Sequence, residues 1–183
     1  NNIADSDAAW ECLKQFQKPA CVIVKHANPC GVSESEDVET AYRKAFQTDP
    51  TSAFGGIIAI NGTLESSLAK EILDNQFVEV LIAPKFNMDA LNVLKKKENI
   101  RVLRCDLDGD AVGNQLKIVS GGVLVQDEDT KIISIDDLKV VSDLKPSQEQ
   151  LDDFMFAWKV AKFVKSNAIV FAKDGQTIGI GAG

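Results

Sequence analysis

Short apolar runs rich in β-branched residues alternate along this chain with stretches of helical periodicity. The apolar runs lie at residues 21–24, 56–60, 77–82, 100–103 and 168–172, and the helical stretches at residues 5–16, 38–46, 64–73, 88–94 and 147 to about 164. A continuous apolar run is typical of a strand that is covered on both faces. Strands that alternate with helices favour an open, largely parallel sheet with helices on its faces. We therefore predict an α/β fold.

Residues 106–145 break this alternation. They contain two short apolar runs, 116–119 and 123–125, without a helical stretch between them, which predicts a small β excursion away from the main sheet. After it, Ser147 and Gln150 have the spacing of a capping box and indicate where the last long helix begins.

The composition restricts the function. The 183 residues carry 20 Lys and Arg against 27 Asp and Glu, a net charge of −7, which argues against a protein whose main partner is a nucleic acid. No apolar run approaches the roughly 20 residues of a membrane span. The four cysteines form no Cys-x-x-Cys pair, so we expect reduced thiols in a cytoplasmic protein. The chain begins with Asn1 rather than Met and stops in the glycine-rich run 179–183, so we expect a piece of a longer protein.

The segment 22–31 carries the strongest indication of chemistry. Its apolar run leads straight into Lys25 and His26 and then into Asn28-Pro29 and Gly31, where we predict a turn. Ligands of open α/β sheets bind beyond the carboxyl ends of strands. His26 is the single histidine, and the ammonium beside it favours the neutral imidazole that a general base near pH 7 requires. The residues alone leave two interpretations open, a general base and a structural histidine.

Three further positions suit a ligand site. The loop 48–56 holds Phe54 and paired glycines whose N–H groups can approach an anion or a heterocycle, although a tight connection explains the glycines equally well. Glu79 is a carboxylate in an apolar strand, so it needs a partner, a ligand or solvent. Asn167 stands at the start of an apolar strand, whereas Lys165 just before it is explained by the dipole of the preceding helix.

These segments resemble a known enzyme family. The run Lys25-His26-Ala27-Asn28-Pro29 resembles the Lys-His-x-Asn-Pro motif of the AICAR transformylase domain of bifunctional, PurH-type purine biosynthesis enzymes, where AICAR is 5-aminoimidazole-4-carboxamide ribonucleotide. The segments 48–56, 77–84, 159–172 and 179–183 agree with the same family, in the same order along nearly the whole chain.

The resemblance implies an activity and the residues that perform it. The family transfers a formyl group from the cosubstrate 10-formyltetrahydrofolate to the 5-amino group of AICAR, and a cyclohydrolase domain then closes the product to IMP. By this resemblance His26 takes the amine proton, Lys25 polarises the formyl oxygen or keeps His26 neutral, and Asn167 holds the carboxamide. The substrate-binding residues carried over in the same way are Asn28, Ser52, Phe54, Gly55 and Glu79.

The resemblance also implies a fold and a domain organisation. The family has three-layer α/β/α, cytidine deaminase-like lobes, so we expect one such lobe with a mostly parallel central sheet and a small β excursion. Within a partial transformylase domain over residues 1–183, we expect the first lobe at about 1–145 and the start of the second at about 146–183. The cyclohydrolase domain and the rest of the second lobe are then absent from this chain.

The deaminase-like fold raises a rival function, a zinc deaminase. Such enzymes need His-x-Glu and Pro-Cys-x-x-Cys, but Asn28 stands where the Glu after His26 is needed and Ser33 where the second Cys is needed. We therefore expect no zinc and no deamination, and we leave a potassium ion open.

The resemblance implies a nucleotide and a folate as small-molecule partners, no nucleic acid or membrane partner, a homodimeric parent enzyme, and little activity of this chain alone. The alternative is a non-catalytic nucleotide-binding or oligomerisation module on the same scaffold.

Overall fold

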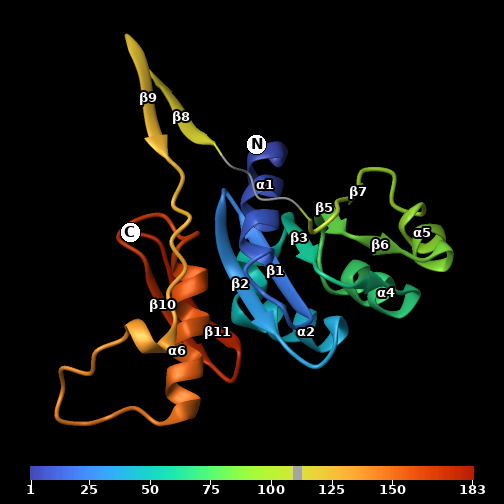
Figure 1. The fold of residues 1–183 in the computed structure, drawn as a ribbon. Helices are drawn as coiled ribbons and strands as arrows, with labels where there is room; N and C mark the ends of the chain where they lie inside the picture. The colour runs from blue at the N-terminus through green and yellow to red at the C-terminus, as the bar shows by residue number, and fades with distance from the viewer. Residues whose placement is uncertain (109–112) are drawn as a thin grey trace. The chain divides into compact units, whose positions relative to one another are not determined.

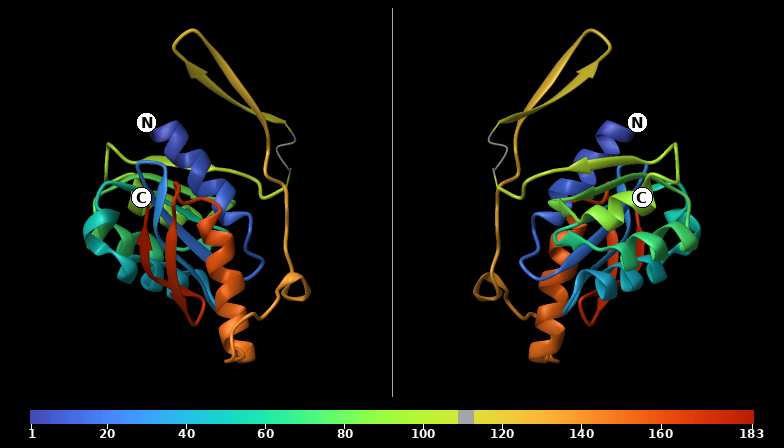
Figure 2. Two further views of the ribbon diagram at one scale, coloured as in Figure 1. Left: turned by 90° about the vertical axis from the view of Figure 1, so that its left-hand side faces the viewer. Right: turned by 90° about the vertical axis from the view of Figure 1, so that its right-hand side faces the viewer.

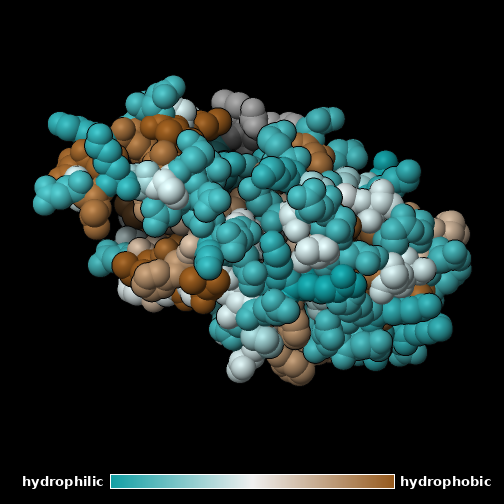
Figure 3. Space-filling view, turned by 90° about the horizontal axis from the view of Figure 1, so that it is seen from below, coloured by the Kyte–Doolittle hydropathy of each residue, from teal (hydrophilic) through white to brown (hydrophobic). Residues whose placement is uncertain are grey.

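The computed structural model describes residues 1–108 and 113–183 (Figure 1). These residues form two units, Asn1–Leu107 together with Pro146–Gly183, and Asp108–Lys145. None of the helices in the described part of the chain has the length and the apolarity that a membrane crossing requires. In Figure 3, hydrophilic side chains cover most of the face in view, with hydrophobic patches among them, as on most folded proteins.

A seven-stranded sheet forms the centre of the first unit, in the order β10-β11-β2-β1-β3-β5-β7. The bounds are β1 (Ala20–Lys25), β2 (Asn28–Glu34), β3 (Gly56–Ile60), β5 (Val78–Ala83), β7 (Arg101–Arg104), β10 (Ile169–Lys173) and β11 (Gln176–Gly181). The neighbours β3, β5 and β7 pair in parallel, while each pair from β10 across to β3 is antiparallel. Five of these strands therefore run in one direction, and β1 and β11 run in the other. Because most strands share one direction, the prediction of a mostly parallel sheet is confirmed.

The strand β2 is the main element that the apolar pattern does not predict. The turn predicted at Asn28 to Gly31 is wrong, because β2 begins at Asn28 and pairs with β1 in an antiparallel hairpin. Pro29 is tolerated in this strand because it lies opposite Val24, where the register shifts in a bulge; bulges are among the few places where a sheet accepts proline. The real turn lies just before the predicted one, at His26 and Ala27.

Helices cover both faces of the sheet, which confirms the predicted three layers (Figure 2). On one face lie α1 (Asn2–Leu13) and α6 (Gln148–Ala161), and on the other α2 (Val38–Thr48), α4 (Ser66–Asn75) and α5 (Met88–Leu94). The side chains of β1 alternate between the two cores, with Val22 and Val24 on the α1 side and Cys21 and Ile23 on the α2 side. The central strands β1, β3 and β5 are thus buried on both faces, as their continuous apolar runs predict. The strands β7 and β10 at the two edges of the sheet are largely exposed, so burial on both faces is wrong for the apolar runs at 100–103 and 168–172.

The helix that follows the excursion belongs to the first unit. The strand β11 pairs with β2, and α6 contributes Phe156 and Val160 to the core on the α1 side. The capping box predicted for Ser147 and Gln150 is present at the start of α6. In this chain the sheet is therefore continuous between residues 1–107 and 146–183, while the division into two lobes at about residue 145 stays a prediction.

The second unit contains the predicted β excursion. Its strands β8 (Asn114–Val119) and β9 (Gly122–Asp127) form an antiparallel hairpin, followed by the short 3-10 helix η1 (Ile135–Asp137). The side chains of both strands are exposed. Residues 109–112 of the predicted excursion lie outside the described residues.

Two short connections complete the first unit. The four-residue helix α3 (Pro50–Ala53) leads from α2 into β3, and the strands β4 (Thr63–Leu64) and β6 (Lys85–Phe86) form a separate parallel pair. The sequence pattern predicts none of these three elements, because each is shorter than the window over which periodicity can be read.

Gly31 shows how closely β2 packs on α2. A Cβ at this position would lie 2.0 Å from the backbone oxygen of Ala45 in α2. The carbonyl carbon of Ala45 would lie 2.9 Å away. Because this carbon and its oxygen belong to the backbone of α2, neither can move aside, and only glycine fits. Gly31, two residues after the Lys-His-x-Asn-Pro motif, is therefore required by the packing of β2 on α2.

We predict that Gly31→Ala lowers the free energy of unfolding by about 3 kcal/mol, the upper part of the usual range for an overpacked core. Urea unfolding followed by far-UV circular dichroism measures this change. The matched control is Gly181→Ala in the same sheet, where the nearest atom to an added Cβ is 4.0 Å away. Equal stabilities of the two variants would contradict the packing described here.

Candidate functional site

The connection between β1 and β2 is a turn of two residues. Lys25 ends β1 and pairs with Asn28, so His26 and Ala27 make up the whole turn. Both have positive φ, 54° and 55°, as the central residues of a type I′ hairpin turn must. Such turns favour Asn and Gly, and another L-residue in this conformation costs about 1–2 kcal/mol. The fold thus holds His26 at the tip of the hairpin in a conformation that its residue type disfavours.

A pocket of about 550 Å³ opens beside this turn, within the size range of about 300–1,000 Å³ that is usual for small-molecule sites. Three segments line it, namely the β1–β2 turn, the end of α2 with α3, and the end of β11. Five predicted site residues are among its lining residues: Lys25, His26, Asn28, Ser52 and Phe54. The structure therefore gathers most of the predicted site around one cavity, and His26 is exposed rather than packed in the core.

Gly55, the sixth predicted residue, holds the Lys25 ammonium. Its carbonyl oxygen accepts a hydrogen bond of 2.7 Å from Lys25 Nζ, and its own N–H donates to the carbonyl oxygen of Phe77 at 2.7 Å. Gly55 has a φ of +69°, and a Cβ on it would lie 2.8 Å from Lys25 Nζ. An ammonium has three donors, so this contact fixes Lys25 at the pocket and leaves two N–H groups for a ligand.

The segment around α3 forms another wall of the pocket. Asp49 caps α3, its carboxylate accepting from the N–H and the hydroxyl of Ser52. These two hydrogen bonds, the one from the hydroxyl first, lower the pKa of Asp49. Phe54 follows with 64% of its surface exposed, and its ring lies 5.7 Å from that of Phe77. It therefore offers a free aromatic surface to a planar ligand.

The segment after α6 also contacts the turn. The N–H of Lys165 donates to Asn28 Oδ1, and Lys165 Nζ donates to the carbonyl oxygen of His26, both at 2.9 Å. Asn167, two residues further on, is exposed, and its N–H donates to the carbonyl oxygen of Gly183 at 2.7 Å. Asn167 does not line the described pocket, so its role at the carboxamide stays a prediction.

Glu79 is the predicted residue that the structure places elsewhere. It is half-buried in β5, and its Oε2 accepts from Asn2 Nδ2 at 3.0 Å and pairs with Arg101 at 3.5 Å. Partners within the chain therefore explain a carboxylate in this strand. Glu79 is not among the lining residues of the pocket, and its part in nucleotide binding stays a prediction.

Several lining or neighbouring residues are absent from the sequence prediction, and Asp49, Cys30 and Lys165 are the ones that bear on the chemistry of the site. Asp49, followed by Pro50, has the pattern of a helix N-cap, and that signal could have found it. Cys30 lines the pocket, but burial raises the pKa of its thiol to about 12, which removes it as a nucleophile. Lys165 carries no local signal, because its contact with His26 spans 139 residues.

Within residues 1–108 and 113–183, no group of three or more His, Cys, Asp or Glu side chains is placed to hold a metal ion.

We predict that Asp49→Ala lowers the free energy of unfolding at pH 7 by about 1 kcal/mol through loss of the cap. Because the folded-state pKa of Asp49 is lowered, its contribution is complete above the unfolded value of about 3.9 and is lost as the pH falls through the folded value. Urea unfolding at pH 7 and pH 3 should show a difference from the wild type that shrinks in acid. Asp49→Asn, which keeps a capping oxygen, is the control and should stay close to the wild type at pH 7. An unchanged difference at both pH values would contradict this role.

The chain was compared with solved structures and with models of protein families. Form 1 of RibD from Acinetobacter baumannii is similar with a TM-score of 0.40 and 14% identity, over 56% of this chain and 35% of that chain. Form 2 of the same protein gives a TM-score of 0.36 and 16% identity, over 56% of this chain and 33% of that chain. The matched part of this chain thus spans about a third of RibD. A family model described as the AICARFT/IMPCHase bienzyme matches residues 1–183, the whole chain, and the chain therefore belongs to this family, as its Lys-His-x-Asn-Pro segment predicts.

Proposed function

We propose that this chain carries part of the formyl-transfer site of a cytoplasmic, PurH-type purine biosynthesis enzyme. The reaction moves a formyl group from 10-formyltetrahydrofolate to the 5-amino group of AICAR. Membership in the AICARFT/IMPCHase bienzyme family supports the general class, a bifunctional enzyme of purine biosynthesis. The observation that carries the specific proposal is the common pocket of Lys25 and His26, which lies where β1 ends.

The two basic side chains suit an attack by a weakly nucleophilic amine. The lone pair of the AICAR amine is delocalised into its ring and carboxamide, so the attack needs a base that removes the proton as the new bond forms. The imidazole of His26 is exposed at the pocket and makes no hydrogen bond to another described residue, so it is free to take that proton. The ammonium of Lys25, fixed by Gly55, supplies a positive charge for the oxygen of the formyl group.

The proposed step balances protons and bonds within these groups. The amine nitrogen forms a bond to the formyl carbon, and its proton passes to His26. The oxygen of the tetrahedral intermediate carries the negative charge beside Lys25. The bond from the formyl carbon to N10 of the folate then breaks, and N10 takes the proton back from His26. The products are the formylated nucleotide and tetrahydrofolate.

We propose that the groups that bind the nucleotide phosphate lie outside this pocket. A nucleotide phosphate carries close to two negative charges and needs Arg or Lys partners. Among the described lining residues, Lys25 is the one Lys or Arg. We therefore propose that the full-length enzyme is a homodimer that adds cations from other segments or from a second subunit. The 183-residue chain alone should then show no measurable steady-state formylation of AICAR, and a measurable rate would contradict this division of the site.

We predict that His26→Ala in the full-length enzyme lowers kcat by about 10²–10⁴-fold, the usual contribution of a general base. The affinity for AICAR, measured by calorimetry, should change by less than about threefold, because the imidazole acts on the amine only as the bond forms.

The control is Lys173→Ala, an exposed residue at the far end of β10, which should leave both quantities unchanged. If kcat of His26→Ala stays within severalfold of the wild type while binding weakens by a similar factor, the chain is a non-catalytic nucleotide-binding module instead.

A further inference from the structure

Lys165 makes a hydrogen bond that its position just beyond a helix does not explain. A lysine just beyond a helix is expected to lie near the last carbonyl groups of that helix. Instead, Lys165 Nζ donates to the carbonyl oxygen of His26, 139 residues earlier in the chain, at 2.9 Å. Its side chain therefore connects the end of the α6 segment to the tip of the β1–β2 hairpin.

The contact belongs to a closed group of three hydrogen bonds, which we call the turn clamp. It consists of Lys165 Nζ to the carbonyl oxygen of His26, the N–H of Lys165 to Asn28 Oδ1, and Asn28 Nδ2 to the same oxygen of His26 at 3.4 Å. Two of these three bonds hold the carbonyl oxygen of a residue whose φ is positive. The clamp thus acts on the backbone unit that sets the direction of the His26 side chain.

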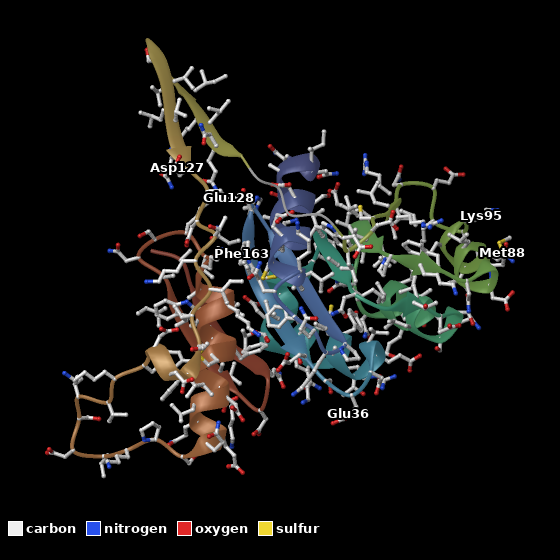
Figure 4. The ribbon with its side chains drawn as sticks, viewed as in Figure 1. Glu36, Met88, Lys95, Asp127, Glu128 and Phe163 are labelled. Atoms are coloured by element: carbon white, nitrogen blue, oxygen red, sulfur yellow. The ribbon has the colours of Figure 1, made fainter. Side chains whose placement is uncertain are left out.

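The residues before Lys165 fix its position. Val164 is 7% exposed, and both Val164 and Phe163 pack against the core on the α1 side. In Figure 4, the labelled Phe163 lies between the end of α6 and α1. The backbone of Lys165 is therefore held by buried neighbours, while its side chain is exposed and contributes little to the core.

We propose that Lys165 is a positioning residue, which holds the strained His26–Ala27 turn so that the imidazole stays directed at the pocket. The inference rests on the proposed function, since it assigns a purpose to the orientation of His26. A type I′ turn without Asn or Gly has no intrinsic preference for the observed conformation. Removal of the ammonium leaves the fold in place and lets the turn and the imidazole take other orientations.

The first test measures kinetics in the full-length enzyme. Lys165→Met removes the donor and keeps the length of the side chain. We expect kcat to fall by about 10–100-fold, the usual effect of a small misplacement of a reacting group, with KM for AICAR unchanged within about twofold. Lys165→Arg, which keeps a charged donor, should recover most of the rate, and Lys173→Met should match the wild type.

The second test needs no activity. The 183-residue chain has one histidine, so its imidazole C2 proton gives a single resonance in a proton NMR spectrum in heavy water. Lys165→Met should shift or broaden this resonance, while Lys165→Arg and Lys173→Met should leave it in place. Far-UV circular dichroism checks the fold of each variant, and Lys165→Ala repeats the test if the Met variant is misfolded.

The outcomes separate this inference from the proposed function. If His26→Ala lowers kcat but Lys165→Met does not, or if the histidine resonance is unchanged in Lys165→Met, the positioning role is wrong and the general base stands. If His26→Ala keeps the full rate, the proposed function is wrong whatever Lys165 does. A fall in kcat that Lys165→Arg recovers, together with the shifted resonance, supports both.

Discussion

The left-handed turn at His26 and Ala27 is the constraint on which the candidate site depends. Because β1 and β2 pair with Lys25 opposite Asn28, two residues must reverse the chain, and both must take positive φ. The strands beneath the turn are buried on both faces, so its place relative to the sheet is fixed by the core. A strong, apolar framework thus holds a locally unfavourable backbone at the edge of the pocket, as is common at functional sites.

The contacts around the turn come from segments that are distant in the sequence. Gly55 precedes β3 and accepts from Lys25, while Lys165 follows α6 and donates to the carbonyl oxygen of His26. The close packing of Gly31 on α2 brings the wall formed by Asp49 and α3 near the same hairpin. Each contact needs the sheet order in which β11 and β2 are neighbours and β1 lies next to β3. The site is therefore a property of the folded unit and cannot exist in the hairpin alone.

The sequence predicts the regular elements better than the connections. The strand β3 and the helix α5 have the predicted bounds, and the other helix ends differ by up to three residues, because long periodic segments carry a strong signal. The strand β2 is missed because Asn, Pro and Gly favour turns, while His26-Ala27 has no turn signal at all. Gly55 and Phe54 are assigned to the site by the family resemblance, since the local pattern of their loop fits a tight connection equally well. The partner of Glu79 on β7 and the contact of Lys165 depend on tertiary pairing that no local pattern encodes.

We propose that the imidazole at the tip of the hairpin meets the amine of the acceptor nucleotide. A crystal structure of the full-length enzyme with AICAR bound tests this claim most directly. We expect the 5-amino nitrogen within about 3.2 Å of an imidazole nitrogen of His26, the reach of a general base, with the ring of AICAR in the pocket that Phe54 lines. AICAR bound with its amine well beyond the reach of His26, or in a different pocket, would contradict it.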